Sequence, residues 1–89
     1  MIIDYTDRFK RKYKKLEQNT KDDFREQLQR FIANPNLPYH PSLRIKKIQG
    51  TENVFELTVT MAIRMTFQFI EEGILIRNIG AHDKTLKNP

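Results

Sequence analysis

The stretch VFELTVTMAIRMTFQFIEEGILIRNIG (Val54–Gly80) decides the fold, because apolar and polar residues alternate along most of it. Alternation is the period of a strand with one buried face. Strands are expected at Val54–Met61 and Ile63–Ile70, and the glycine of residues 71–73 suits a hairpin turn before a last strand at Ile74–Gly80. Such short connections predict antiparallel neighbours in a twisted sheet.

Two helices are expected upstream, each marked by one apolar stripe at helical spacing. The stripe residues are Phe9, Tyr13 and Leu16 in the first helix, and Phe24, Leu28, Phe31 and Ile32 in the second. Thr6 should cap the first helix, and Thr20 with Asp23 should form a variant capping box that starts the second. Asn34-Pro35 should end it. The short break between the helices predicts an antiparallel helical hairpin.

Further strands are expected on both sides of the helical pair, at Ile2–Tyr5 and, after a proline-rich loop, at Leu43–Ile48. The predicted order is therefore β-α-α-β-β-β. The fold class is α+β: an N-terminal strand, a helical hairpin and an antiparallel twisted sheet with the helices packed on one face. A chain of 89 residues predicts one domain, residues 1–89.

Composition restricts the chemistry that this chain can perform. Cysteine is absent, which excludes disulfides, zinc–thiolate sites and thiol catalysis. The start of the chain has only a two-residue apolar run before charged residues, so no signal peptide or membrane span is expected, and the protein should be cytoplasmic. The formal charge of +5 favours an acidic partner. Nucleic acid is the commonest one, but an acidic protein or a merely lysine-rich surface would also fit.

Strand alternation assigns the basic residues to the sheet face that the helices leave free. The residues expected there are Arg44, Lys46, Glu56, Arg64 and Arg77. On an ordinary solvated sheet face, Glu56 and Arg64 would be no more than a cross-strand ion pair that adds little stability. Alternatively, four bases on a free sheet face suit a phosphate backbone, because the arginine fork matches phosphate oxygens.

The same alternation sorts the apolar residues. Met61 is expected to face the helices. In the last strand, Ile74 and Ile76 facing the helices would leave Arg77 and Ile79 on the other face, unless a bulge intervenes.

His82 and Asp83 follow the last predicted strand. Imidazole can give or take a proton near neutral pH, and a neighbouring carboxylate could hold it charged. The only other histidine, His40, lies in the proline-rich loop, so no metal site is expected. The pair is either a solvated tail or one side of an active site.

His40–Leu86 resembles the RelE/ParE superfamily of bacterial and archaeal toxins from type II toxin–antitoxin systems, in its RelE/YafQ/YoeB-like branch. The resemblance consists of a Leu-x-x-Lys-x-Ile-x-Gly segment from Leu43 to Gly50, a strand start at Ile63-Arg64-Met65, an apolar strand, and Gly-x-His ending at His82. It implies a microbial-ribonuclease-like α+β fold, with one toxin domain spanning residues 1–89.

The resemblance also implies an activity: metal- and cofactor-independent cleavage of mRNA on the ribosome, which inhibits translation. In this chemistry a 2′-hydroxyl attacks its own 3′-phosphate, so a base, an acid and positive groups are needed. By resemblance, Arg64 would hold the scissile phosphate and His82 would be a general acid or base, with Arg77 and Glu56 as further catalytic candidates. The RNA-gripping basic strand would contain Arg44, Lys46 and Lys47.

The resemblance has one departure, because many active members place an aromatic residue near the C-terminal histidine. Here residues 83–86 are not aromatic, so Tyr39 in the loop is the expected stacking partner for a base. The implied partners are mRNA and an acidic, partly disordered antitoxin. Two alternatives stay open: a ParE-like toxin that binds gyrase without nuclease chemistry, and an inactive relative that binds RNA or the ribosome. His82 favours the nuclease over the gyrase-binding toxin.

Overall fold

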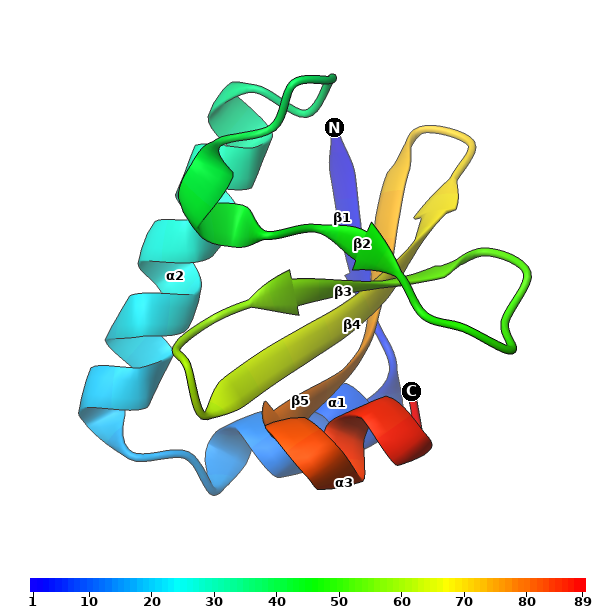
Figure 1. Cartoon of the computed structure of the whole chain (residues 1–89). Coiled ribbons are helices and arrows are strands. Elements are labelled where there is room, and N and C mark those ends of the chain that lie inside the picture. The colour runs from blue at the N-terminus through cyan, green and yellow to red at the C-terminus, as the bar shows by residue number, and fades with distance from the viewer.

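The computed structural model describes residues 1–89 and confirms the α+β class (Figure 1). Its elements in chain order are β1 (Ile2–Tyr5), α1 (Asp7–Lys14), α2 (Gln18–Ala33), the 3₁₀ helix η1 (Pro41–Leu43), β2 (Lys46–Lys47), β3 (Val54–Thr58), β4 (Ile63–Ile70), β5 (Gly73–Ala81) and α3 (His82–Lys87). The predicted order is present, and α3 is an addition that the sequence reading missed. No helix combines the length and the apolar character needed to cross a membrane.

The strands form one five-stranded sheet in the order β1-β5-β4-β3-β2. β2 to β5 are antiparallel neighbours, as predicted. β1 instead pairs in parallel with β5, with Ile2 opposite Gly73, so the sheet is mixed. The reason is topological: β1 occupies one edge, and the chain then crosses the sheet through α1 and α2 to begin β2 at the other edge.

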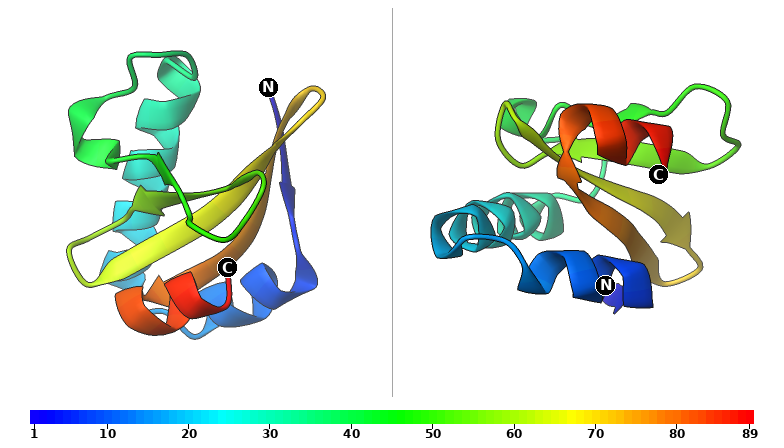
Figure 2. Two further views of the ribbon diagram at one scale, coloured as in Figure 1. Left: turned by 45° about the vertical axis from the view of Figure 1, so that its right-hand side comes forward. Right: turned by 90° about the horizontal axis from the view of Figure 1, so that it is seen from below.

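The helices α1 and α2 lie on one face of the sheet, and α3 lies on the other (Figure 2). Figure 1 shows α1 across the foot of α2, so the two helices meet at a corner instead of running side by side. Phe9 and Phe24 join them there, with ring centroids 5.5 Å apart. Beneath α2, Phe31 packs on Phe67 of β4. The core is therefore a single layer between these helices and the sheet.

The helix starts follow local hydrogen bonds. Thr6 caps α1 as predicted, because its Oγ1 accepts a bond from the Phe9 N–H at 3.1 Å. The predicted start of α2 at Thr20 is wrong: α2 begins at Gln18 without a side-chain cap, and a bond from the Gln18 side chain to Asp22 (2.9 Å) stabilises its first turn. The predicted apolar stripe of α2 is also modified, since Ile32 is 42% exposed whereas Gln27 is buried.

Two strand predictions extend too far. Leu43–Ile48 is a strand only at Lys46–Lys47, because η1 takes up Leu43 and Arg44 has a left-handed backbone (φ 46°). β3 ends at Thr58, and Met61, predicted to face the helices, lies 69% exposed in the β3–β4 connection. In this connection Thr60 and Ile63 exchange main-chain hydrogen bonds in a tight turn, and the oxygens of Thr60 and Met61 accept bonds from the Arg64 side chain.

A β-bulge changes the faces of β5. Thr66 pairs with Asn78 and Phe67 with Ile76, so Arg77 is the extra residue. Ile79 therefore returns to the core with Ile74 and Ile76, and all three are fully buried. The prediction that Ile79 faces away from the helices is wrong for this reason.

Candidate active site on the open face of the sheet

Cross-strand pairing brings the candidate side chains together on the sheet face opposite α1 and α2. One row of direct partners runs Lys46–Glu56–Thr66–Asn78 across four strands, and the next runs Thr58–Arg64–Gly80. Direct partners project to the same side, with Cβ atoms about 5 Å apart. Lys46, Glu56 and Arg64 therefore lie on one face, as alternation predicts.

Glu56 and Arg64 form an ion pair within this face. Nε of Arg64 lies 3.5 Å from Oε1 of Glu56, and the side chains are only 9% and 7% exposed. Nη1 of Arg64 donates to the main-chain oxygens of Thr60 (2.6 Å) and Met61 (3.0 Å). The guanidinium is thus fixed from two sides. A buried pair of this kind adds little net stability, so its position calls for another reason.

The hydrogen bonding of this pair is incomplete. Nε of Arg64 is sealed from solvent and makes no hydrogen bond. Nη2 makes none within the protein either, but unlike Nε it is not sealed from solvent. The Glu56 carboxylate has Arg64 as its one polar side-chain contact and accepts no hydrogen bond. The site therefore presents one donor and one carboxylate, held side by side, to any molecule that binds the open face.

His82 is the first residue of α3 and is held by its main chain. Its N–H donates to the Ala62 oxygen at 2.9 Å, so His82 is anchored to the β3–β4 connection that Arg64 also binds. Its side chain is 46% exposed, and Nδ1 lies 2.9 Å from Oδ1 of Asp83. This hydrogen bond and the charge of His82 lower the pKa of Asp83 below its ordinary value. Nε2 of His82 has no hydrogen-bond partner in the protein.

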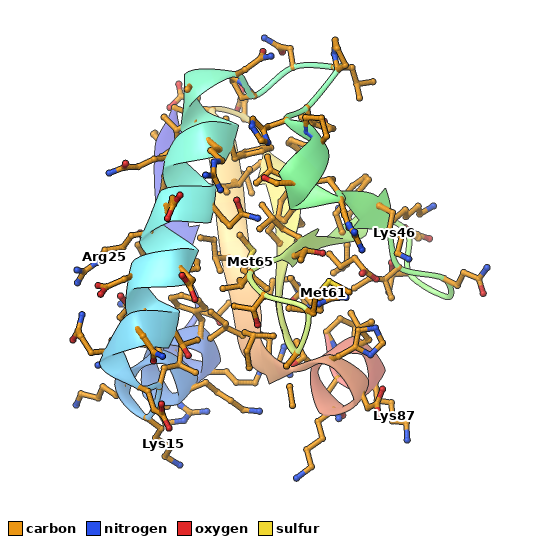
Figure 3. All side chains as sticks on the ribbon, turned by 60° about the vertical axis from the view of Figure 1, so that its left-hand side comes forward. Lys15, Arg25, Lys46, Met61, Met65 and Lys87 are labelled. Carbon is orange, nitrogen blue, oxygen red and sulfur yellow. The ribbon has the colours of Figure 1, made fainter.

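Arg44 and Met61 form the rim of the site. Nη1 of Arg44 lies 3.8 Å from the Met61 sulfur. Figure 3 shows Met61 and Lys46 on the side away from α2, whereas Met65 lies beneath that helix. Arg44 follows η1 directly and has a left-handed backbone. Strand alternation could not have indicated its position at this rim.

Arg77 is separated from these groups by α3 and the residues after it. Its Nε donates to the main-chain oxygen of Pro89 (3.1 Å), and its Nη1 donates to Gln68. Thr66 and Asn78 likewise donate to the main-chain oxygens of Pro89 (3.0 Å) and Asn88 (2.8 Å). These bonds satisfy chain-end oxygens and hold α3 on β4 and β5. The part of the face that α3 leaves uncovered therefore lies over β2, β3 and the start of β4, where Glu56, Thr58 and Arg64 are nevertheless only 5–7% exposed.

Two of the predicted RNA-binding residues lie elsewhere. Lys47 pairs with Phe55 and so points to the opposite side of β2 from Lys46. The Tyr39 ring is part-buried and packs on Phe31, with centroids 5.7 Å apart, on the helix-covered side of the sheet. The structure thus places Lys46, Glu56 and Arg64 on one face, with Arg44 beside Met61 and the main chain of His82 bound to the β3–β4 connection.

Sequence reasoning missed α3 and the main-chain oxygens of the β3–β4 connection. α3 has no apolar stripe, but it has Asp83 in its first turn and Lys84 and Lys87 in its last. This charge order favours a helix and was the available signal. No sequence signal marks the carbonyl groups that position Arg64 and His82.

The mixed sheet, with α1 and α2 on one face and a short helix after the last strand on the other, defines the class as the α+β fold of RelE-type toxins. The fold expected from the resemblance is therefore confirmed. No protein-family model matches the sequence, and no curated protein matches it significantly.

Three solved structures illustrate the likeness. The RelB–RelE antitoxin–toxin complex from Methanococcus jannaschii has a chain with a TM-score of 0.74 and 15% identity, covering 97% of this chain and 99% of that one. YafQ from E. coli has a TM-score of 0.77 and 13% identity, covering 94% and 96%. The YoeB dimer from Staphylococcus aureus has a TM-score of 0.76 and 14% identity, covering 92% and 97%. At these identities the likeness defines the fold.

Proposed function

We propose that this chain is the toxin of a RelE/YafQ/YoeB-type toxin–antitoxin pair and that it cleaves mRNA on the ribosome without a metal or cofactor. The observation that carries the proposal is the Glu56–Arg64 pair, a carboxylate beside a guanidinium whose Nη2 makes no hydrogen bond within the protein, on the sheet face opposite α1 and α2. His82 supports it, because its main chain is bound to the same β3–β4 connection as Arg64. The activity would stop translation in the cytoplasm.

The proposed chemistry divides the proton transfers between Glu56 and His82. The Glu56 carboxylate takes the proton of the 2′-hydroxyl, whose oxygen attacks the adjacent 3′-phosphorus. Nη2 of Arg64 donates to a phosphate oxygen as negative charge develops there. Protonated His82 gives a proton from Nε2 to the departing 5′-oxygen. The products are a 2′,3′-cyclic phosphate and a 5′-hydroxyl, which leaves the proton and charge balance complete.

The test is 5′-end mapping of cellular mRNA after brief induction of the chain. Wild type should create new ends in translated regions, and Arg64→Ala or His82→Ala should remove them. Arg11→Ala is the matched control, because it deletes the same charge from the exposed surface of α1, outside the groove between α1 and α2. Growth arrest without new ends would contradict nuclease activity, and equal loss in the Arg11 variant would contradict the assigned site.

An acidic antitoxin is the proposed protein partner. Structures with this fold include the RelB–RelE and DinJ–YafQ toxin–antitoxin complexes. In this chain, a groove of about 300 Å³ between α1 and α2 combines apolar walls with two basic side chains, Lys10 and Arg25. Co-expression with a short acidic reading frame encoded beside this gene should give a stable complex and relieve toxicity. Toxicity that persists despite complex formation would contradict an antitoxin role.

One observation favours a second candidate, a relative that binds RNA or the ribosome without cutting. All nine phenylalanine and tyrosine residues contact one another in clusters with α1, α2 or the helix-facing side of the sheet, so the open face offers no phenylalanine or tyrosine ring for base stacking. In that case RNA would bind, but neither new ends nor arrest would follow induction.

A further inference from the structure

Gly80 and Thr85 make an unusually close contact beside the candidate site. Gly80 is the direct cross-strand partner of Arg64, so any side chain at Gly80 would project onto the same open face. A Cβ atom placed there would lie 2.9 Å from Oγ1 of Thr85. Only a residue without a side chain leaves room for Thr85 in its present position.

Thr85 cannot easily move away from such a Cβ atom. Its side chain is fully buried between α3 and the sheet, and a β-branched side chain has few alternative rotamers. Its Oγ1 is sealed from solvent and has no hydrogen-bond partner. An unpaired buried hydroxyl is unfavourable, so hydrogen bonding does not explain this residue. What Thr85 supplies is its shape, which fills the space above Gly80.

Thr85 and His82 belong to the same short helix, α3. Thr85 follows His82 by three residues in α3, so the two side chains start from the same side of the helix. The N-terminal end of α3 is held by the bond from His82 N–H to Ala62. Thr85, one turn later, is the next point at which α3 rests on β5. Together these two anchors fix the position and direction of the helix.

We propose that Gly80 and Thr85 are a positioning pair that sets His82 against Arg64, an inference that rests on the proposed nuclease function. Neither residue contacts the RNA. The pair acts through the tilt of α3, since displacing Thr85 turns the helix about the His82–Ala62 bond. A shift of about 1 Å in a proton-transfer group can lower a rate up to about 100-fold.

The test is a set of substitutions with two readouts on the full chain. Gly80→Ala should lower kcat for RNA cleavage by about 10- to 100-fold and leave KM nearly unchanged, because β3 and β4 separate the RNA-binding Lys46 of β2 from Gly80 of β5. The same variant should speed hydrogen exchange at the His82 N–H. Adding Thr85→Ala makes room for the new methyl group, so the double variant should recover part of the lost kcat and of the protection from exchange; the rest reflects the backbone of residue 80 (φ 159°), a conformation that residues with side chains rarely adopt.

Thr85→Val is the shape-matched control, and it should keep wild-type kcat and exchange because it removes only the unpaired hydroxyl. If Gly80→Ala fails to fold, Thr85→Ala can still be compared with Thr85→Val. Thr85→Ala leaves empty space between α3 and the sheet, whereas Thr85→Val keeps that space filled, so only Thr85→Ala should loosen the helix. The proposal is overturned if Gly80→Ala leaves kcat and His82 exchange unchanged, or if Thr85→Ala does not rescue it. If wild type cuts no RNA, the nuclease function fails, while hydrogen exchange alone still decides whether the pair positions His82.

Discussion

Two neighbouring lysines on β2 offer a comparison at the scale of single residues. Lys46 lies opposite Glu56 on the open face, whereas Lys47 lies opposite Phe55 and points to the other side. Lys46→Ala should weaken binding of single-stranded RNA and reduce the slope of log affinity against log salt by about 0.7, the value for one lost phosphate contact. Lys47→Ala should change the slope less. Fluorescence anisotropy over a salt series measures both, and equal slopes would contradict the assigned RNA face.

The pair of His82 and Asp83 gives a second prediction for single residues. The hydrogen bond and charge of His82 lower the pKa of Asp83, so ionised Asp83 favours the folded state above the ordinary carboxyl pKa of about 3.9. This contribution disappears as pH falls through the lowered pKa. His82→Gln should return the Asp83 pKa toward its ordinary value, as measured by NMR titration of the carboxyl carbon. An unchanged pKa would show that the pair does not form in solution.

At the scale of elements, Arg64 braces the β3–β4 connection. Arg64→Ala removes the bonds to Thr60 and Met61 and leaves Glu56 without its partner. Breaking a buried ion pair typically destabilises by about 3–5 kcal/mol, and a loss of this order is expected here because both side chains are more than nine-tenths buried. Urea unfolding measures the loss.

The double variant Glu56→Gln/Arg64→Ala separates the two contributions. It should be more stable than Arg64→Ala alone, because no unpaired carboxylate remains. A double variant that is less stable than Arg64→Ala would show that the main-chain bonds, and not the ion pair, explain the loss.

The strands also show how far sequence reasoning reaches. The predicted bounds of β4 agree with the structure, because apolar and polar residues alternate from Ile63 to Phe69. β5 is apolar at nearly every position, so alternation could not locate the bulge at Arg77 or the inward turn of Ile79. Alternation also continues past the end of β3 to Met61, where the chain turns back toward β4. These outcomes depend on tertiary contacts that no local pattern contains.

The candidate site was predictable to a similar extent. Alternation alone placed Glu56 and Arg64 on one face and anticipated their ion pair. The placement of His82 depended on α3, whose charge pattern is weak, and the placement of Tyr39 depended on a loop without periodicity. The proximity of Gly80 to Thr85 was not accessible, because it arises only when α3 folds back onto β5.

At the scale of the whole molecule, the two faces of the sheet differ in composition. The aromatic residues pack with α1, α2 and the inner side of the sheet, whereas the open face has charged and polar residues held by main-chain bonds. One molecule thus presents an apolar groove between its two long helices and a polar surface on the opposite side. Two partners of different chemistry could bind these surfaces at the same time.

Because the aromatic residues lie on one side of the sheet, the intrinsic tyrosine fluorescence of the protein can report which surface is occupied. The chain has no tryptophan, and Tyr5, Tyr13 and Tyr39 all lie on the helix side, with Tyr5 and Tyr13 lining the groove. Tyrosine emission should therefore change when a peptide enters the groove and stay nearly constant when RNA occupies the open face. A titration excited at the tyrosine band would therefore distinguish the two events without any label.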